Sequence, residues 1–227
     1  MATLKDSREA TSETLAAVSR LGVLSGAGVF VVALGVLHVL RSDLHPVERM
    51  MSEYAVGDYG VLMTLAFLAM AGACASLVLG LTQTVPRPAL SVAGLVLLGV
   101  WALVMVLFAI FPIGVGETVD STSDVIHRSA APIGFFGVTA GVFLVSRRFG
   151  EDASWGSLSL AGSIIAVVML VASISFFVSY AAEASVEGLA QRLLIIAFLG
   201  WSITVALRLN SMTDLDKLDP DDARESA

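Results

Sequence analysis

Two histidines and two carboxylates are the side chains best suited to chemistry in this 227-residue chain. His45, His127, Glu53 and Asp124 offer the mixed nitrogen and oxygen ligands that suit Zn²⁺ or a similar divalent ion. The two histidines lack the spacing of an HExxH helix, so loops would have to assemble the site. A metal-dependent membrane hydrolase is therefore an alternative hypothesis for the function of this chain.

Three arginines indicate a second possible chemistry, the binding of an anionic group. Arg49, Arg128 and Arg192 could meet a phosphate or carboxylate through paired N–H donors, with Ser52 nearby. This predicts a pocket for a lipid headgroup, a small ligand or a partner subunit. The candidate pocket residues are His45, Arg49, Ser52, Glu53, Tyr54, His127, Arg128, Gln191 and Arg192.

A simpler interpretation needs no ligand. The acids and arginines could form ion pairs and helix caps that fix one end of a helix bundle, because both signs of charge recur there. Under this interpretation we expect Glu53 to pair with Arg192 or Arg128.

Other chemistries have weaker signals. His38 and His127 could ligate one b-type haem, but a lone histidine at a helix end is more often hydrogen-bonded, so we predict no haem. Ser52 and His45 are residue types of a hydrolytic triad, yet no nucleophile elbow surrounds them. Small-solute transport stays open, although no apolar segment carries an acid or base at its middle. The net charge of −7 argues against a nucleic-acid partner.

Long apolar segments must position these residues. Apolar residues make up 56% of the chain and charged residues 15%, which is typical of an integral membrane protein. Five windows of 18 residues or more lack Asp, Glu, Lys and Arg, and a sixth, Leu193–Leu207, is shorter and flanked by arginines. We therefore predict an all-α, polytopic membrane protein, a bundle of six transmembrane helices at about residues 21–42, 59–84, 89–112, 125–146, 155–180 and 189–208.

The predicted domain organisation has three parts. Residues 1–20 form a polar cytoplasmic leader, residues 21–209 the transmembrane domain, and residues 210–227 an acidic tail that we expect to be disordered. Pro132 falls inside the fourth helix, where it should kink the helix or widen its upper end.

Charge asymmetry predicts the orientation. Nine of the 13 Lys and Arg residues fall on the side that holds both termini and four on the other. The positive-inside rule then places both termini in the cytoplasm of a cell whose inner or plasma membrane holds the protein. The segment Asp43–Gly60 would face outward, on the same side as the candidate pocket residues.

Several ordered motifs carry a family resemblance. They are His45-Pro46, Ser52-Glu53-Tyr54-Ala55, Gly57, Gly60, Phe111-Pro112, the segment from Thr122 through His127 to Ala130-Ala131, Gly188-Leu189, Gln191-Arg192, Trp201 and Arg208. Together they resemble the domain of unknown function 998 family of bacterial and archaeal membrane proteins. The resemblance implies a six-helix membrane bundle and leaves its activity unassigned.

The function favoured by these observations is a binding role without catalysis, while enzyme activity stays an open question. The expected partners are membrane lipids, with a partner membrane protein or a second copy of the chain as alternatives. No cofactor is predicted, apart from the divalent metal considered above.

Overall fold

Six α-helices build the structure, a computed structural model that describes residues 2–215, with side chains described for residues 14–209. Three short 3₁₀ helices lie in the connections: η1 (Met51–Ala55), η2 (Arg87–Ala89) and η3 (Gly116–Thr118). The described residues contain no strand, which confirms the all-α prediction. The α-helices are α1 (Ala2–Leu40), α2 (Gly60–Thr84), α3 (Val92–Ile110), α4 (Thr122–Phe149), α5 (Ser157–Ala181) and α6 (Glu187–Leu215).

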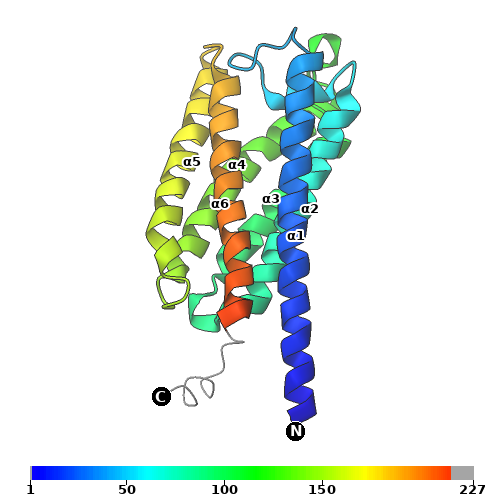
Figure 1. Ribbon diagram of the computed structural model, residues 1–227. Coiled ribbons are helices and arrows are strands. Elements are labelled where there is room, and N and C mark those ends of the chain that lie inside the picture. Colours follow the sequence, from blue (N-terminus) through cyan, green and yellow to red (C-terminus); the bar gives the residue numbers. More distant parts are fainter. Residues whose placement is uncertain (1, 216–227) are drawn as a thin grey trace.

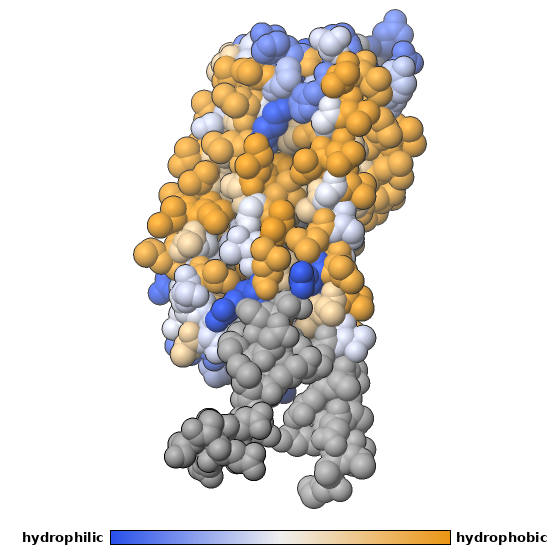
Figure 2. All heavy atoms as spheres, viewed as in Figure 1, coloured by the Kyte–Doolittle hydropathy of each residue, from blue (hydrophilic) through white to orange (hydrophobic). Residues whose placement is uncertain are grey.

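Each α-helix contains a stretch that is long and apolar enough to cross a membrane. Within residues 14–209, this stretch is Thr14–Leu40 in α1, Glu187–Leu209 in α6 and the whole length of each of the other four helices. Figure 2 shows hydrophobic side chains covering the middle of the visible face, with hydrophilic ones towards its ends. The predicted six-helix membrane bundle is therefore confirmed.

From Ala2 onward, the segment predicted as a leader, residues 1–20, lies on the same helix as the first apolar stretch. Helix α1 runs without interruption from Ala2 to Leu40, so no helix boundary falls between residues 20 and 21. The predicted tail begins inside α6, which continues to Leu215, and its remaining residues, 216–227, lie outside the described residues.

Consecutive helices pack side by side, and α1 also packs against α6, which closes the bundle (Figure 1). Small residues permit the close approach of α1 and α2, since a Cβ at Gly26 would lie 2.5 Å from the carbonyl oxygen of Ala69. In the core, the Trp101 ring meets the edges of Phe135 and Phe198 at centroid distances of 6.1 and 6.0 Å. Helices α3, α4 and α6 are thereby joined at the middle of the bundle.

Three loops share one end of the bundle because the helices alternate in direction. Residues 41–59 connect α1 to α2, residues 111–121 connect α3 to α4, and residues 182–186 connect α5 to α6. Figure 1 shows this end opposite the start of α1 and the end of α6. We call it the loop end, and most of the candidate pocket residues lie on it.

Candidate functional site

The loop of residues 41–59 is held closed by an arginine at its base. The Arg41 guanidinium binds both carboxylate oxygens of Asp43, at 3.0 Å from Nε to Oδ1 and 2.9 Å from Nη2 to Oδ2. It also donates to the carbonyl oxygen of Val56 at 2.8 Å, which joins the beginning of the loop to its end. This hydrogen bonding holds the pKa of the exposed Asp43 carboxyl below its usual value.

Within this loop, Glu53 is buried and has a local partner. One carboxylate oxygen pairs with Arg49 Nη2 at 2.6 Å and the other accepts the backbone N–H of Met50 at 2.9 Å. Arg128 instead pairs with Asp124, and no carboxylate among residues 14–209 forms an ion pair with Arg192. The predicted pairing of Glu53 with Arg192 or Arg128 is therefore wrong, because Arg49, four residues earlier in the chain, is its ion-pair partner.

Tyr54 fixes the loop from inside the bundle. Its side chain is fully buried, and its hydroxyl donates to the carbonyl oxygen of Leu44 at 2.8 Å. Burial raises the pKa of the Tyr54 phenol, so the neutral donor persists at physiological pH. Tyr54 thus supports the loop from below.

Arg192 links α6 to the loop and to α1. Its Nη1 donates to the carbonyl oxygens of Arg49 and Gly188, each at 2.9 Å. Its Nε and Nη2 approach Nε2 of His38 at 3.3 and 3.2 Å. A guanidinium can only donate, so His38 is neutral with its lone pair on Nε2.

Two further hydrogen bonds join the loop of residues 41–59 to α6. The Oε1 atom of Gln191 accepts the N–H of Met51 at 2.6 Å. The N–H of Leu189 donates to the carbonyl oxygen of Val47 at 3.0 Å. Close approach of α6 to the loop requires glycine at position 188, since a Cβ there would lie 2.6 Å from the carbonyl oxygen of Pro46.

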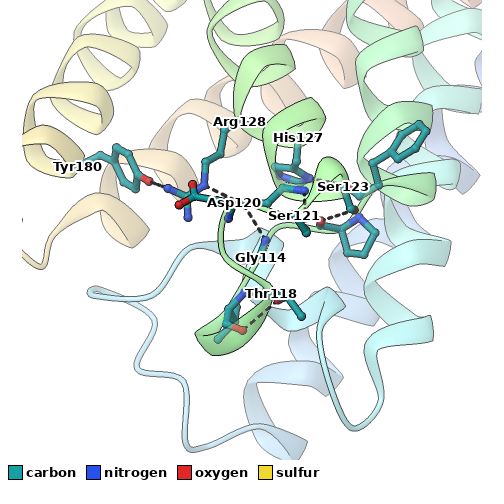
Figure 3. A network of polar contacts seen from close by, with 12 residues as sticks. Gly114, Thr118, Asp120, Ser121, Ser123, His127, Arg128 and Tyr180 are labelled. Carbon is teal, nitrogen blue, oxygen red and sulfur yellow. Dashed lines mark hydrogen bonds and ion pairs between the residues drawn. The ribbon is translucent and has the colours of Figure 1, made fainter.

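A second polar network lies at the start of α4 (Figure 3). Its centre is Asp124 in the first turn of that helix. The side chain is fully buried and accepts hydrogen bonds from the N–H of Gly114 at 2.7 Å and of Asp120 at 2.9 Å. Arg128 Nε pairs with it at 2.8 Å. Figure 3 shows Arg128 continuing to Tyr180 of α5, whose hydroxyl it contacts through Nη1. Asp124 therefore ties the α3–α4 loop to α4 and, through Arg128, to α5.

His127 has one ring nitrogen fixed by the same loop. Its Nδ1 lies 2.8 Å from the carbonyl oxygen of Phe111. Because a carbonyl oxygen only accepts, Nδ1 carries a proton, and in the neutral form of the ring the lone pair is then on Nε2. The ring stacks on Phe108 with a centroid distance of 4.1 Å. The described residues provide no hydrogen-bond partner for Nε2.

A cavity of about 250 Å³ adjoins this network, between η1 and helices α3 to α6. Pro132 lines it while α4 continues through that residue without interruption. Four of the predicted pocket residues line it: Ser52, His127, Arg128 and Gln191. The other lining residues are Met50, Phe108, Ile113, Ala131, Pro132, Phe135, Phe176, Phe177 and Tyr180.

The remaining predicted pocket residues lie elsewhere. His45 is exposed on the loop surface, and Arg49, Glu53 and Tyr54 form the internal contacts of the loop. Arg192 lines a separate groove between α1 and α6. The single pocket expected from the sequence is thus divided in two by α6.

The four residues considered as metal ligands do not come together. His45 is exposed, Glu53 is engaged by Arg49, and the carboxylate of Asp124 already accepts three donors. Among residues whose side chains are described, no three His, Cys, Asp or Glu form a group suited to a metal ion.

Tyr180 is a lining residue that sequence reasoning missed. Its ring faces the Arg128 guanidinium at 5.6 Å from Cζ to the ring centroid, in addition to the hydroxyl contact. Its position as the penultimate residue of an apolar helix is the available signal, since tyrosine favours the membrane interface.

The fold and this arrangement define a class: an integral membrane protein with six helices and a structured polar cap over one end of the bundle. The chain belongs to the DUF998 family, proteins of unknown function, whose family model matches residues 24–208. The resemblance seen in the sequence motifs is therefore confirmed. Neither a curated protein nor a solved structure matches the chain.

Proposed function

We propose that this protein binds an amphipathic lipid, or a small ligand of similar chemistry, in the cavity between α4 and α5. The observation that carries the proposal is that the lining of the cavity is polar at one end and apolar at the other. His127, Arg128 and Tyr180 lie nearer the loop end of their helices, whereas Phe135 and Phe176 lie nearer the middle. Such a cavity suits a molecule with a polar head and an apolar body.

The electrostatics favour a head group without net charge. Arg128 is the cation of the lining, and Asp124 neutralises it at 2.8 Å. A formal anion would have to compete with that carboxylate. A hydroxyl or ester oxygen of the head group can accept from Arg128, and a hydroxyl can also donate to Nε2 of His127, which has no protein partner among the described residues.

The proposed setting is the inner or plasma membrane, with both termini in the cytoplasm and the loop end facing outward. The excess of Lys and Arg on the termini side supports this orientation. The cavity would then meet lipids of the outer leaflet.

The metal-dependent hydrolase and the transporter have less support. The candidate metal ligands are held apart, and catalysis by a metal would need a different donor set. The apolar spans of α2, α3 and α5 carry no Asp, Glu, Lys or Arg of the kind that ion pathways use.

The test is mass spectrometry of the intact protein purified from its membrane, with a cavity-filling variant. Ala131 lines the cavity, so Ala131→Phe should displace a bound lipid. Ala161 of α5 is exposed on the bundle surface, so Ala161→Phe adds the same bulk without filling the cavity. We expect the wild type and Ala161→Phe to carry the ligand and Ala131→Phe to lose it. Equal ligand content in all three proteins would refute the proposal.

A further inference from the structure

A second hollow lies on the other side of α6, open along the outer face of the bundle. This groove of about 290 Å³ runs between α1 and α6 and is lined by apolar side chains, among them Phe30, Leu34 and Ile195. Gly35 widens it, since a Cβ at this position would meet nothing within 4 Å. Ile196 in the lining is 66% exposed, so the groove is open to the surrounding lipid.

The polar end of this groove is positively charged. Arg192 and His38 both line it. Arg192 donates to two carbonyl oxygens and contacts the neutral ring of His38. Its Cζ also lies over the Tyr54 ring, 5.9 Å from the ring centroid, and within residues 14–209 it forms no ion pair. The carboxylate of Glu53 is already neutralised by Arg49 at 2.6 Å. Among residues 14–209, Arg192 therefore has no carboxylate in direct contact, in contrast to Arg128 in the other cavity.

The depth of the charge matches a lipid phosphate. Arg192 is five residues after Glu187, the first residue of α6, which places it about 8 Å along the helix from the loop end. The apolar lining continues on α1 from His38 to Phe30, a further distance of about 12 Å. The hydrocarbon of one leaflet is about 15 Å thick, so the groove has the length of an acyl chain segment below its head group.

We propose that the groove between α1 and α6 binds an anionic phospholipid of the bilayer, with its phosphate at Arg192 and one acyl chain along the groove. The Arg192 guanidinium, which has no carboxylate in direct contact among residues 14–209, selects the negative head group through charge-assisted hydrogen bonding. The apolar walls hold the chain by burying hydrocarbon surface. This site is separate from the cavity between α4 and α5, and neither proposal depends on the other.

The experiment uses the full-length protein in vesicles of phosphatidylcholine and phosphatidylglycerol in equal parts, followed by extraction and analysis of the lipids that stay bound. The wild type should retain phosphatidylglycerol about five- to tenfold over phosphatidylcholine, the advantage expected for one arginine near the interface. Arg192→Gln should keep a bound lipid and lose this preference.

A second variant tests the groove without touching the arginine. Gly35→Leu adds a side chain into the groove, and Gly28→Leu is its matched control, because a Cβ at Gly28 also meets nothing within 4 Å and the residue does not line the groove. Gly35→Leu should lose the retained phosphatidylglycerol and Gly28→Leu should keep it.

Two results would overturn the proposal. One is an unchanged ratio of the two lipids in both Arg192→Gln and Gly35→Leu. The other is a change of oligomeric mass in Gly35→Leu with unchanged lipid content, which would assign the groove to a second copy of the chain.

Discussion

Replacing Asp124 by asparagine should destabilise the loop end more than any other single polar change there. The carboxylate is fully buried and accepts from the N–H groups of Gly114 and Asp120 and from Arg128. An asparagine amide has one acceptor oxygen and an NH₂ group, so in either orientation at least one of the three donors faces another donor. The substitution also removes the counter-charge of Arg128.

The magnitude follows from these contacts. One buried donor without a partner costs about 1–3 kcal/mol, and the weakening of a charge-assisted hydrogen bond to a neutral one costs about 1 kcal/mol more. Because the Arg128 side chain is 36% exposed, water screens part of the lost attraction. We expect a loss of about 3 kcal/mol, which corresponds to a fall of about 6–12 °C in the unfolding midpoint for a protein of this size.

Tryptophan fluorescence of the detergent-solubilised protein can measure this midpoint, because Trp101, Trp155 and Trp201 are all buried. The matched control is Asp43→Asn, the same chemical change at a carboxylate that is 61% exposed. The control should lower the midpoint far less, because water screens the exposed ion pair of Asp43 with Arg41. A midpoint for Asp124→Asn that equals that of the control would show that the buried network does not hold the bundle end.

Two further outcomes follow from the loop of residues 41–59. Gly188→Ala places a Cβ 2.6 Å from the carbonyl oxygen of Pro46, so it should lower the unfolding midpoint. The control is Gly200→Ala on the same helix, whose Cβ meets open space and should leave the midpoint unchanged or raise it. Equal midpoints for the two variants would contradict the close packing at Gly188. The pKa of Asp43 is lowered by its hydrogen bonds with Arg41, so the ion pair stabilises the loop above the usual carboxyl pKa and this stabilisation is lost as the pH falls through the lowered value. As the pH falls, hydrogen exchange of the loop amides should therefore become faster in the wild type relative to Asp43→Asn. The same pH profile in both proteins would count against a stabilising role of the ion pair.

The sequence was sufficient to predict the six helices, because each contains a long apolar stretch and the connections between them are polar. The second helix was predicted at about residues 59–84 and is observed at Gly60–Thr84, since hydrocarbon spans leave little freedom in where a helix crosses. The first and last helices are longer than predicted. Their additional turns are polar, and a hydropathy pattern does not report whether a polar segment continues a helix.

The contacts of the site were harder to predict because they depend on how the loops fold. The sequence placed His127, Arg128, Gln191 and Ser52 in one pocket, and these four do line one cavity. The pairing of Glu53 was wrong because residues 51–55 form a 3₁₀ helix that brings a local arginine within reach. A partner four residues away requires far less ordering of the chain than one on another helix.

The division of the loop end into two hollows has a simple geometric cause. Gln191 and Arg192 are consecutive on α6, and consecutive residues of an α-helix point about 100° apart. Gln191 lines the cavity of α4 and α5, whereas Arg192 lines the groove of α1. In η1, Met51 and Ser52 likewise line the groove and the cavity respectively. The contacts between η1 and α6 therefore border both hollows, which are similar in size but differ in charge. The first contains the ion pair of Arg128, and the second contains Arg192, which forms no ion pair within residues 14–209. Under the two proposals, a neutral amphiphile and an anionic lipid would occupy adjacent sites without competing for either.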